Sequence, residues 1–279
     1  MRDRFPAWTC PVRHRPALSL TGFLGRPVLS VVLVAVVAAC GDSATGPGDQ
    51  TFDYSHTLGP GASARDFLSD EDFTRLTIEI DYVEGLQPSQ RALDSLQVFL
   101  ERRLHKPGGI EILLDDAIPS PGQSPYSAAE IRALEEEHRD TFSQEGELAA
   151  YILFLDGEFE QQNVLGLAYW NTSMTLFGQV IRDHTGGLTQ PDTWVIEATS
   201  LRHEMGHILG LVNNGTSMVG EPGGPEDHHD AANGAHCTEE GTLMYYQVET
   251  TNFIDNLTGG QVLQLEPLGI RDLQANGGK

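Results

Sequence analysis

The chain has 279 residues, with 17 Lys and Arg against 40 Asp and Glu and a formal net charge of −23. This negative charge repels phosphate backbones and anionic lipid surfaces, so nucleic acid is excluded as a partner. The chain has three cysteines, two of them within the first 40 residues, which excludes a disulfide scaffold and a multi-cysteine metal cluster. The length remaining after residue 40 suits one domain, which we expect to be a monomer.

The N-terminus has the pattern of an export signal. Residues 1–26 are rich in arginine, and the small and apolar run 28–39 is shorter than the roughly 20 residues that span a bilayer. The sequence VAAC, which ends at Cys40, resembles the lipobox of bacterial lipoproteins and implies lipidation of Cys40. The alternative is an ordinary secretory signal in which Cys40 is incidental. We expect a signal peptide over 1–39, a lipidated Cys40 with a flexible tether over 40–66, and an exported protein anchored to a membrane of the bacterial envelope, periplasmic or surface-facing.

The middle of the chain alternates strand and helix patterns. Period-two alternation predicts a strand over 75–83, and leucines at helical spacing predict a helix over 89–105. The elements expected next are a strand over 109–116, a surface helix over 127–140 with a capping box from Ser127 to Glu130, an apolar central strand over 148–157, and an edge strand or hairpin over 163–178. This order predicts an α/β (α+β) fold: a sheet with helices over 67–210, then a loop-rich lower subdomain over 211–279.

The next predicted helix, over 190–210, carries a metal-binding pattern. Its apolar stripe runs from Trp194 to Ile208 in steps of four and three, and Thr189 with Asp192 matches a capping box at its start.

Within that helix, the stretch HEMGH (203–207) has the spacing of a zinc site. His203 and His207 lie four residues apart, so both imidazoles project from one face and can bind one Zn²⁺. Glu204 comes near the same ion, where it can act as general base on a water. Gly210 stands where the helix must stop, and glycine suits the left-handed position after a helix end.

The stretch HEMGHILG (203–210) resembles the start of the metzincin signature HExxHxxGxxH. That signature places its third ligand at Asn213, whose amide oxygen is a poor zinc ligand beside imidazole. The stretch HCTEEGTLM (236–244) resembles the archaemetzincin pattern HCx₄CxM, which implies His236 as third ligand and Met244 as the Met-turn. Residues 213–235 then form an inserted loop. The resemblance implies a metzincin-like zincin fold, with a mixed twisted sheet, backing helices and an active-site helix.

Several positions remain open. His228 and His229 are alternative third ligands, and with Asp227 and Asp230 they could instead hold a second cation. Thr242 replaces the second cysteine of the archaemetzincin pattern, so the second, structural zinc of that family is expected to be absent. Cys237 is then a lone thiol, better explained as buried filler than as a redox group.

Tyr246 lies two residues after Met244, the offset at which some metzincins place a tyrosine that ligates zinc or stabilises the oxyanion. The alternative role for Tyr246 is packing with Tyr245 beneath the site.

The resemblance implies a zinc-dependent peptidase, an endopeptidase, with one catalytic Zn²⁺, a peptide or protein substrate and Glu204 as base. By the same analogy the substrate would pair with LGLAYWNTS (165–173) at the sheet edge. One alternative is a non-catalytic, surface-binding lipoprotein with a structural or vestigial zinc site. Another is a gluzincin-like site that uses a downstream glutamate, the candidates being Glu221, Glu226 and Glu239.

Overall fold

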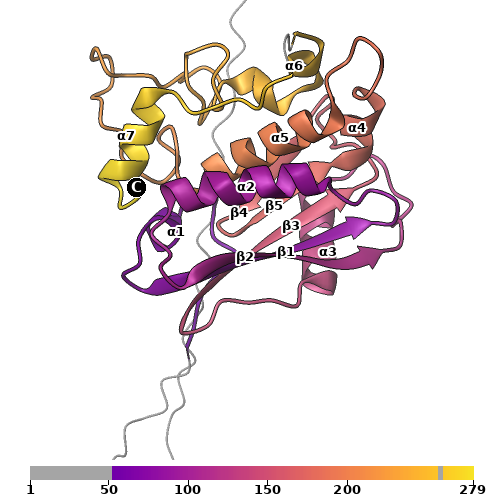
Figure 1. Cartoon of the computed structure of the whole chain (residues 1–279), viewed down its shortest axis with the longest axis horizontal. Coiled ribbons are helices and arrows are strands. Elements are labelled where there is room, and N and C mark those ends of the chain that lie inside the picture. The colour runs from indigo at the N-terminus through magenta and orange to yellow at the C-terminus, as the bar shows by residue number, and fades with distance from the viewer. Residues whose placement is uncertain (1–51, 257–259) are drawn as a thin grey trace, which may run out of the picture. The chain divides into compact units, whose positions relative to one another are not determined.

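The computed structural model describes residues 52–256 and 260–279 (Figure 1). The expected signal peptide, Cys40 and the first part of the tether lie outside these described residues. None of the helices in the described ranges has the length and apolar character needed to cross a membrane.

A five-stranded sheet forms the centre of the domain. Its order is β2-β1-β3-β5-β4, and every neighbouring pair is parallel except β4 with β5. The strands are β1 (Phe73–Val83), β2 (Gly109–Ile118), β3 (Gly146–Leu155), β4 (Gly166–Trp170) and β5 (Ser173–Phe177). The apolar strand predicted as central is β3, in the middle of the order, and the predicted edge hairpin is β4–β5. The α/β prediction is therefore confirmed.

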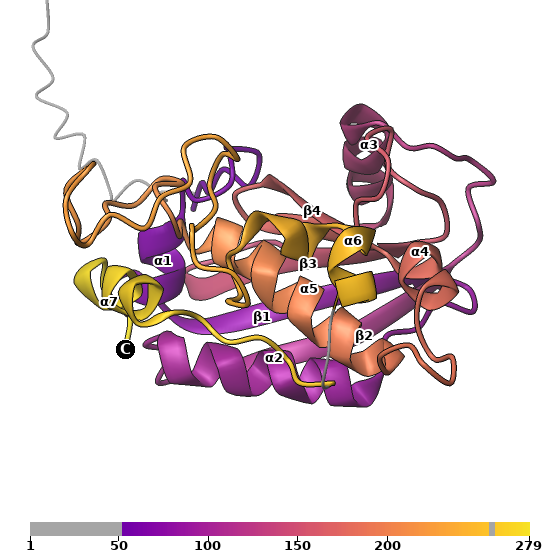
Figure 2. The ribbon, with the colours of Figure 1, turned by 90° about the horizontal axis from the view of Figure 1, so that it is seen from above.

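Helices cover both faces of this sheet. Helices α2 (Gln90–Arg103) and α5 (Thr193–Ile208) lie side by side over one face, and α3 (Ala128–His138) lies on the opposite face (Figures 1 and 2). Burial of apolar side chains on both faces gives two clusters, a larger one beneath α2 and α5 and a smaller one beneath α3. The predicted capping box at the start of α3 is present, with Ser127 and Glu130 bonded reciprocally.

Strand β1 differs from its prediction in one respect. Alternation predicted one buried face, but Thr77, Glu79 and Asp81 on the other face are buried as well. The carboxylate of Glu79 accepts hydrogen bonds from the backbone amides of Asp140 (2.9 Å) and Thr141 (2.5 Å). The loop after α3 thus covers this face, which the alternation of β1 alone could not indicate.

The domain also begins earlier than the predicted boundary at residue 67. Asn171 binds the segment that composition had assigned to the tether: its Oδ1 accepts from the Leu58 amide and its Nδ2 donates to the Ser55 carbonyl, both at 2.9 Å. A short helix, α1 (Ala64–Leu68), follows and packs into the core. Residues 52–66 therefore belong to the folded domain, because a distant side chain satisfies their backbone groups.

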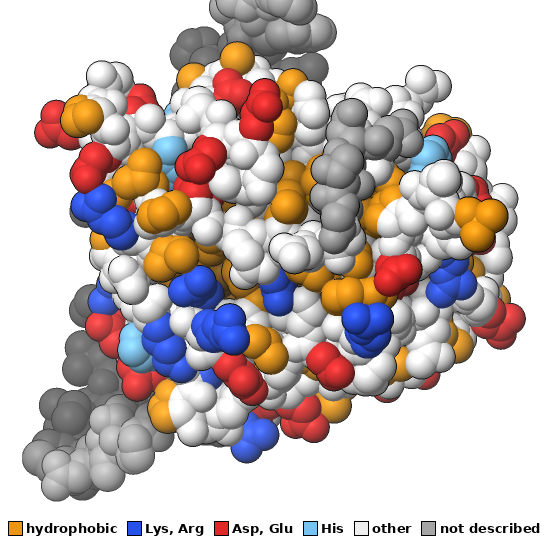
Figure 3. All heavy atoms as spheres, turned by 45° about the horizontal axis from the view of Figure 1, so that its top comes forward, with side chains coloured by type: hydrophobic (Ala, Val, Ile, Leu, Met, Phe, Trp, Pro, Cys, Tyr) orange, Lys and Arg blue, Asp and Glu red, His pale blue; other side chains and the backbone are white. Residues whose placement is uncertain are grey.

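Helix α5 (Thr193–Ile208) begins later than expected. Asp192 is the N-cap residue and its side chain makes no capping hydrogen bond, so the predicted Thr189–Asp192 capping box is absent. The remaining helical elements are short: α4 (Gly178–Asp183), the 3₁₀ helix η1 (Tyr246–Glu249), α6 (Thr251–Asn256) and α7 (Pro267–Ala275). In the described part of 211–279, residues 211–245 and 260–266 contain no helix or strand, as the turn-rich composition of this region predicted. Acidic and basic side chains are interspersed over the face in Figure 3, so that face does not carry charge of one sign.

Candidate metal centre

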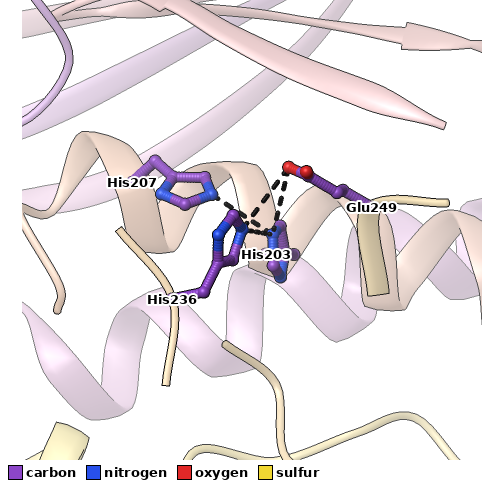
Figure 4. Close-up of side chains that lie close together, drawn as sticks. All are labelled: His203, His207, His236 and Glu249. Atoms are coloured by element: carbon purple, nitrogen blue, oxygen red, sulfur yellow. Dashed lines mark hydrogen bonds and ion pairs between the residues drawn. The ribbon is translucent and has the colours of Figure 1, made fainter. Parts of the chain in front are cut away.

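Three histidine rings converge at the middle of the domain. His203 and His207 project from successive turns of α5, and His236 enters from the loop that follows the helix (Figure 4). The Nε2 atom of His203 lies 3.2 Å from that of His207 and 3.3 Å from that of His236. A tetrahedral ion with Zn–N bonds of about 2.0–2.1 Å would separate neighbouring nitrogens by about 3.3–3.4 Å. The spacing of the rings therefore fits one zinc ion.

Hydrogen bonds on the far side of the rings set their orientation. His203 Nδ1 is 2.6 Å from the Leu243 carbonyl oxygen, and His236 Nδ1 is 2.6 Å from that of Asn233. A carbonyl only accepts, so each Nδ1 carries the proton and, in the neutral ring, Nε2 presents a lone pair. Two lone pairs then face each other at 3.3 Å with no proton between them. A cation would satisfy both.

Burial keeps two of the three rings neutral. Desolvation, followed by the nearby His236, lowers the pKa of His203 to about 4, and desolvation lowers that of His207 well below its ordinary value. Desolvation also lowers the pKa of His236, but hydrogen bonding and attraction to Glu249 raise it above the ordinary value overall. Neutral imidazole is the form that binds metal.

Glu204 lies between the histidine cluster and the edge strand. Its Oε2 accepts a hydrogen bond from the Ala168 amide at 2.8 Å, whereas its buried Oε1 has no hydrogen-bond partner. A Cβ placed on Gly166 would come within 2.9 Å of Oε1, so this glycine leaves room for the carboxylate. Desolvation and then the charge of Glu249 raise the pKa of Glu204 well above its ordinary value. A nearby cation would favour the ionised form instead.

A fourth side chain, Glu249, completes the cluster and was missed from the sequence. It projects from η1, and its Oε2 lies 3.4 Å from Nε2 of His236 and 4.0 Å from Nε2 of His203. One ligand atom from each of the four residues lies within 4.8 Å of the others. Glu249 stands five residues after Met244 in a stretch without periodicity, and the downstream glutamates weighed above ended at Glu239. Glu249 reaches the histidine cluster only because η1 directs the chain back toward α5, and no sequence pattern signals this path.

Two contacts fix the α5 side of the site. The Met244 sulfur lies under α5, where a Cβ on Gly206 would meet it at 2.4 Å, so the helix and the methionine approach closely only because residue 206 is glycine. Gly210 has a φ of +78°, and the amides of Gly210 and Leu211 bond the carbonyls of His207 and Gly206 in a Schellman motif. The predicted glycine stop is thus present, with Met244 packed beneath the histidine-bearing turn.

The alternative third ligands lie elsewhere. His228 is held between Glu266 and Asp272, with Nδ1 and Nε2 each 2.8 Å from a carboxylate oxygen. His229 Nε2 contacts the Gly234 carbonyl at 2.8 Å. Asn213 is exposed and has a φ of +60°, as in a turn.

Tyr246 contacts its neighbours in the chain, and the three candidate glutamates lie outside the histidine cluster. The Tyr246 hydroxyl accepts a hydrogen bond from the Gln247 side chain at 3.1 Å, and its ring lies tilted by 58° against that of Tyr245. Glu226 forms an ion pair with Arg271 at 2.6 Å, while Glu221 and Glu239 are exposed.

The two carboxylates considered for a second cation, those of Asp227 and Asp230, accept hydrogen bonds from residues of their own loop. Asp227 accepts from the His229 amide and Asp230 from the Asn233 side chain. Among the described residues, the groups placed to hold a metal are the histidine cluster and an acidic group on the sheet, Glu79, Asp81 and Asp115.

Cys237 packs next to the histidine cluster without joining it. Its thiol is buried and lies 3.1 Å from the hydroxyl of Thr242, the residue at the second cysteine position of the archaemetzincin pattern. Burial raises the pKa of Cys237 to about 11, so the thiol stays protonated at neutral pH.

No family model matches the chain, and no curated protein matches it. Among solved structures, the chain is similar to the crystal structure of archaemetzincin from Methanopyrus kandleri, with 15% sequence identity and a TM-score of 0.47 over 73% of this chain and 96% of that one. A likeness at this level does not assign the chain to a family or an activity.

Proposed function

We propose that this protein is a zinc-dependent peptidase that cleaves internal peptide bonds. The observation that carries the proposal is the convergence of three buried imidazoles, those of His203, His207 and His236, beside the buried carboxylate of Glu204. A purely structural zinc site has no need of an adjacent carboxylate with a free oxygen. A hydrolase needs one, because the attacking water must lose a proton.

The residues would divide the chemistry between them. Zinc held by the three histidines supplies Lewis-acid activation of the water and of the peptide carbonyl. Glu204, through its unpartnered Oε1, accepts the proton of the attacking water and passes it to the leaving nitrogen. The hydrogen bond from Ala168 to Oε2 holds the carboxylate in place during both transfers.

The sheet edge offers a place for an extended substrate. Strand β4 is the last strand of the sheet, and its residues Gly166 and Ala168 contact Glu204. An extended peptide that pairs along β4 would run past the base and the metal ligands. This contact between the edge strand and the base supports the substrate alignment expected from the sequence.

Glu249 favours a second candidate function. Four protein ligands are typical of closed, structural zinc sites, whereas catalytic sites keep a position open. Three histidines with Glu249 make such a four-ligand set. The second candidate is therefore a non-catalytic surface-binding protein whose zinc stabilises the loop-rich subdomain.

The Glu204→Gln variant tests the first function against the second. Peptide hydrolysis, measured on a quenched fluorescent peptide library and on casein, should fall by about 10²–10⁴-fold, the usual contribution of a general base. Zinc content should be unchanged, because Glu204 is not a ligand. Glu240→Gln, the same change at an exposed carboxylate outside the histidine cluster, serves as the control. Equal hydrolysis by wild type and Glu204→Gln, or no hydrolysis by zinc-loaded wild type, rules out the proposed peptidase and leaves the structural-zinc candidate.

We also propose that the protein is lipid-anchored at the bacterial envelope through Cys40. The support is the basic start, the short apolar run and the VAAC sequence. Expression of Cys40→Ser in a bacterium should move the protein from the membrane to the soluble fraction and abolish incorporation of a labelled fatty acid. Fatty-acid labelling of the variant equal to that of wild type would contradict the anchor.

A further inference from the structure

We propose that Glu249 is a fourth, displaceable ligand of the metal and that η1 holds the site closed until substrate displaces it. The inference rests on the metal centre of the proposed function but not on peptide hydrolysis. Its first support is distance. Glu249 Oε2 lies 3.4 Å from Nε2 of His236, close to the roughly 3.3–3.4 Å between the ligand atoms of tetrahedral zinc.

The second support is how differently the four ligands are held. His203 and His236 each direct a ring nitrogen to a backbone carbonyl at 2.6 Å, and their side chains are 0% and 8% exposed. Glu249 has a side chain that is 30% exposed, and it stands on a 3₁₀ helix of only four residues. The carboxylate is therefore the ligand that can leave with the least disruption of packing.

The third support is what the chain does beside Glu249. Its carbonyl accepts a hydrogen bond from the Leu165 amide at 2.8 Å, and the Thr251 amide donates to the Asn163 carbonyl at 2.9 Å. Between these bonds, Val164 and Thr250 form an antiparallel bridge.

Residues 249–251 thus pair with the chain immediately before β4, where an extended peptide approaching β4 would also pair. The protein's own segment occupies part of the substrate path while its carboxylate occupies the fourth ligand position. Glu204 distinguishes this arrangement from a permanently closed structural site, because its carboxylate is held by the Ala168 amide and keeps an oxygen without a hydrogen-bond partner.

The test replaces Glu249 in the full chain and follows the metal directly. Cobalt-substituted wild type should show the visible absorption of a four-coordinate site with a carboxylate. In Glu249→Gln and Glu249→Ala the cobalt bands should shift and zinc affinity should fall by about 10–100-fold, the range seen when contacts around a metal are lost. Acetohydroxamate, a small metal-binding probe, should bind the cobalt form of both variants at least about 10-fold more tightly than wild type, because the position is open.

Two controls keep the outcomes separate. Glu240→Gln removes an exposed carboxylate of the same region and should match wild type in every readout. Glu249→Asp keeps the charge but shortens the reach, so its cobalt spectrum should resemble that of Glu249→Gln. Unchanged cobalt spectra, or acetohydroxamate affinities equal to wild type in folded Glu249 variants, would overturn the proposal. Shifted spectra and tighter probe binding without peptide hydrolysis in any variant would support Glu249 as ligand and reject the peptidase.

Discussion

Two regions of the molecule build the proposed metal centre in different ways. Helix α5 supplies His203 and His207 from one 16-residue segment, and its residues from Val195 to Ile208 are all buried. The loop-rich region after Gly210 supplies His236 and Glu249 from segments with few apolar residues and little regular structure. The helix fixes its ligands by local periodicity, whereas the loops fix theirs by individual hydrogen bonds. A defect in α5 should therefore abolish the site, while a defect in the loops should change its affinity or access.

The largest effect is expected in α5. His207→Ala removes a ligand held by the rigid helix, so zinc affinity should fall by more than about 100-fold, since even supporting contacts are worth roughly 10–100-fold. His229→Ala is the matched control, because the His229 ring contacts a loop carbonyl and His229 lies outside the histidine cluster. Metal content after dialysis measures both. Full zinc occupancy in folded His207→Ala would break the comparison.

The next largest effect is expected at the clamp, our name for the contact of His228 with Glu266 and Asp272, which joins the loop before His236 to helix α7. His228 is buried between Glu266 and Asp272, and its truncation to Ala leaves two carboxylates without their partner. Loss of one member of a buried charged group costs about 3–5 kcal/mol. Urea unfolding should show this loss for His228→Ala and not for His229→Ala.

The same clamp gives a pH dependence. Burial lowers the pKa of His228, but bonding to Asp272 and Glu266 more than offsets this and raises it from 6.5 to about 9. The folded pKa exceeds the unfolded one, so the stabilisation is complete below pH 6.5 and is lost as pH rises through about 9. The difference in unfolding free energy between wild type and His228→Ala should shrink over that range. A difference that grows with pH would contradict this protonation state.

A smaller effect is expected where helix and loop touch. Gly206→Ala places a methyl against the Met244 sulfur, and such overpacking costs about 1–3 kcal/mol, partly offset by roughly 1 kcal/mol of better helix propensity. In a double-mutant cycle with Met244→Ala, the glycine substitution should cost less, because the opposing side chain is gone. Thermal unfolding of the four proteins measures the coupling. Strict additivity would show that the two residues do not touch.

The smallest effect is expected at Asn213. Its left-handed backbone suits asparagine or glycine, so Asn213→Ala should cost about 1–2 kcal/mol and Asn213→Gly should be nearly neutral. Neither variant should lose zinc. Reduced zinc content in Asn213→Gly would restore this residue as a ligand.

The sequence predicted most of the sheet because the central strands carry strong patterns. The near-continuous apolar run of β3 and the leucine spacing of α2 determine their structures locally. In contrast, α4, α6 and α7 have six, six and nine residues, too few for a clear period.

The residues of the candidate site differ in the same way: some could be predicted from local sequence patterns, and others depend on contacts between distant segments. The spacing of His203 and His207 places them together on any helix, and the resemblance of HCTEEGTLM (236–244) to the archaemetzincin pattern implied His236. Glu249 could not be predicted, because its position depends on the path of η1 and on pairing with residues 163–165. The bonding of His228 to Glu266 and Asp272 could not be predicted either, because these partners lie about 40 residues away and no local pattern marks them.

The burial of α5 from Val195 to Ile208 has a consequence for the rate at which a bound ion would leave. Amide protons in the middle of α5 should exchange only through global unfolding, whereas those around His236 should exchange through local opening of the loop. Ion release would therefore begin at His236 and Glu249 and follow the opening rate of the loop. The pair of imidazoles on α5 would remain in place as a half-site that recaptures the ion when the loop closes.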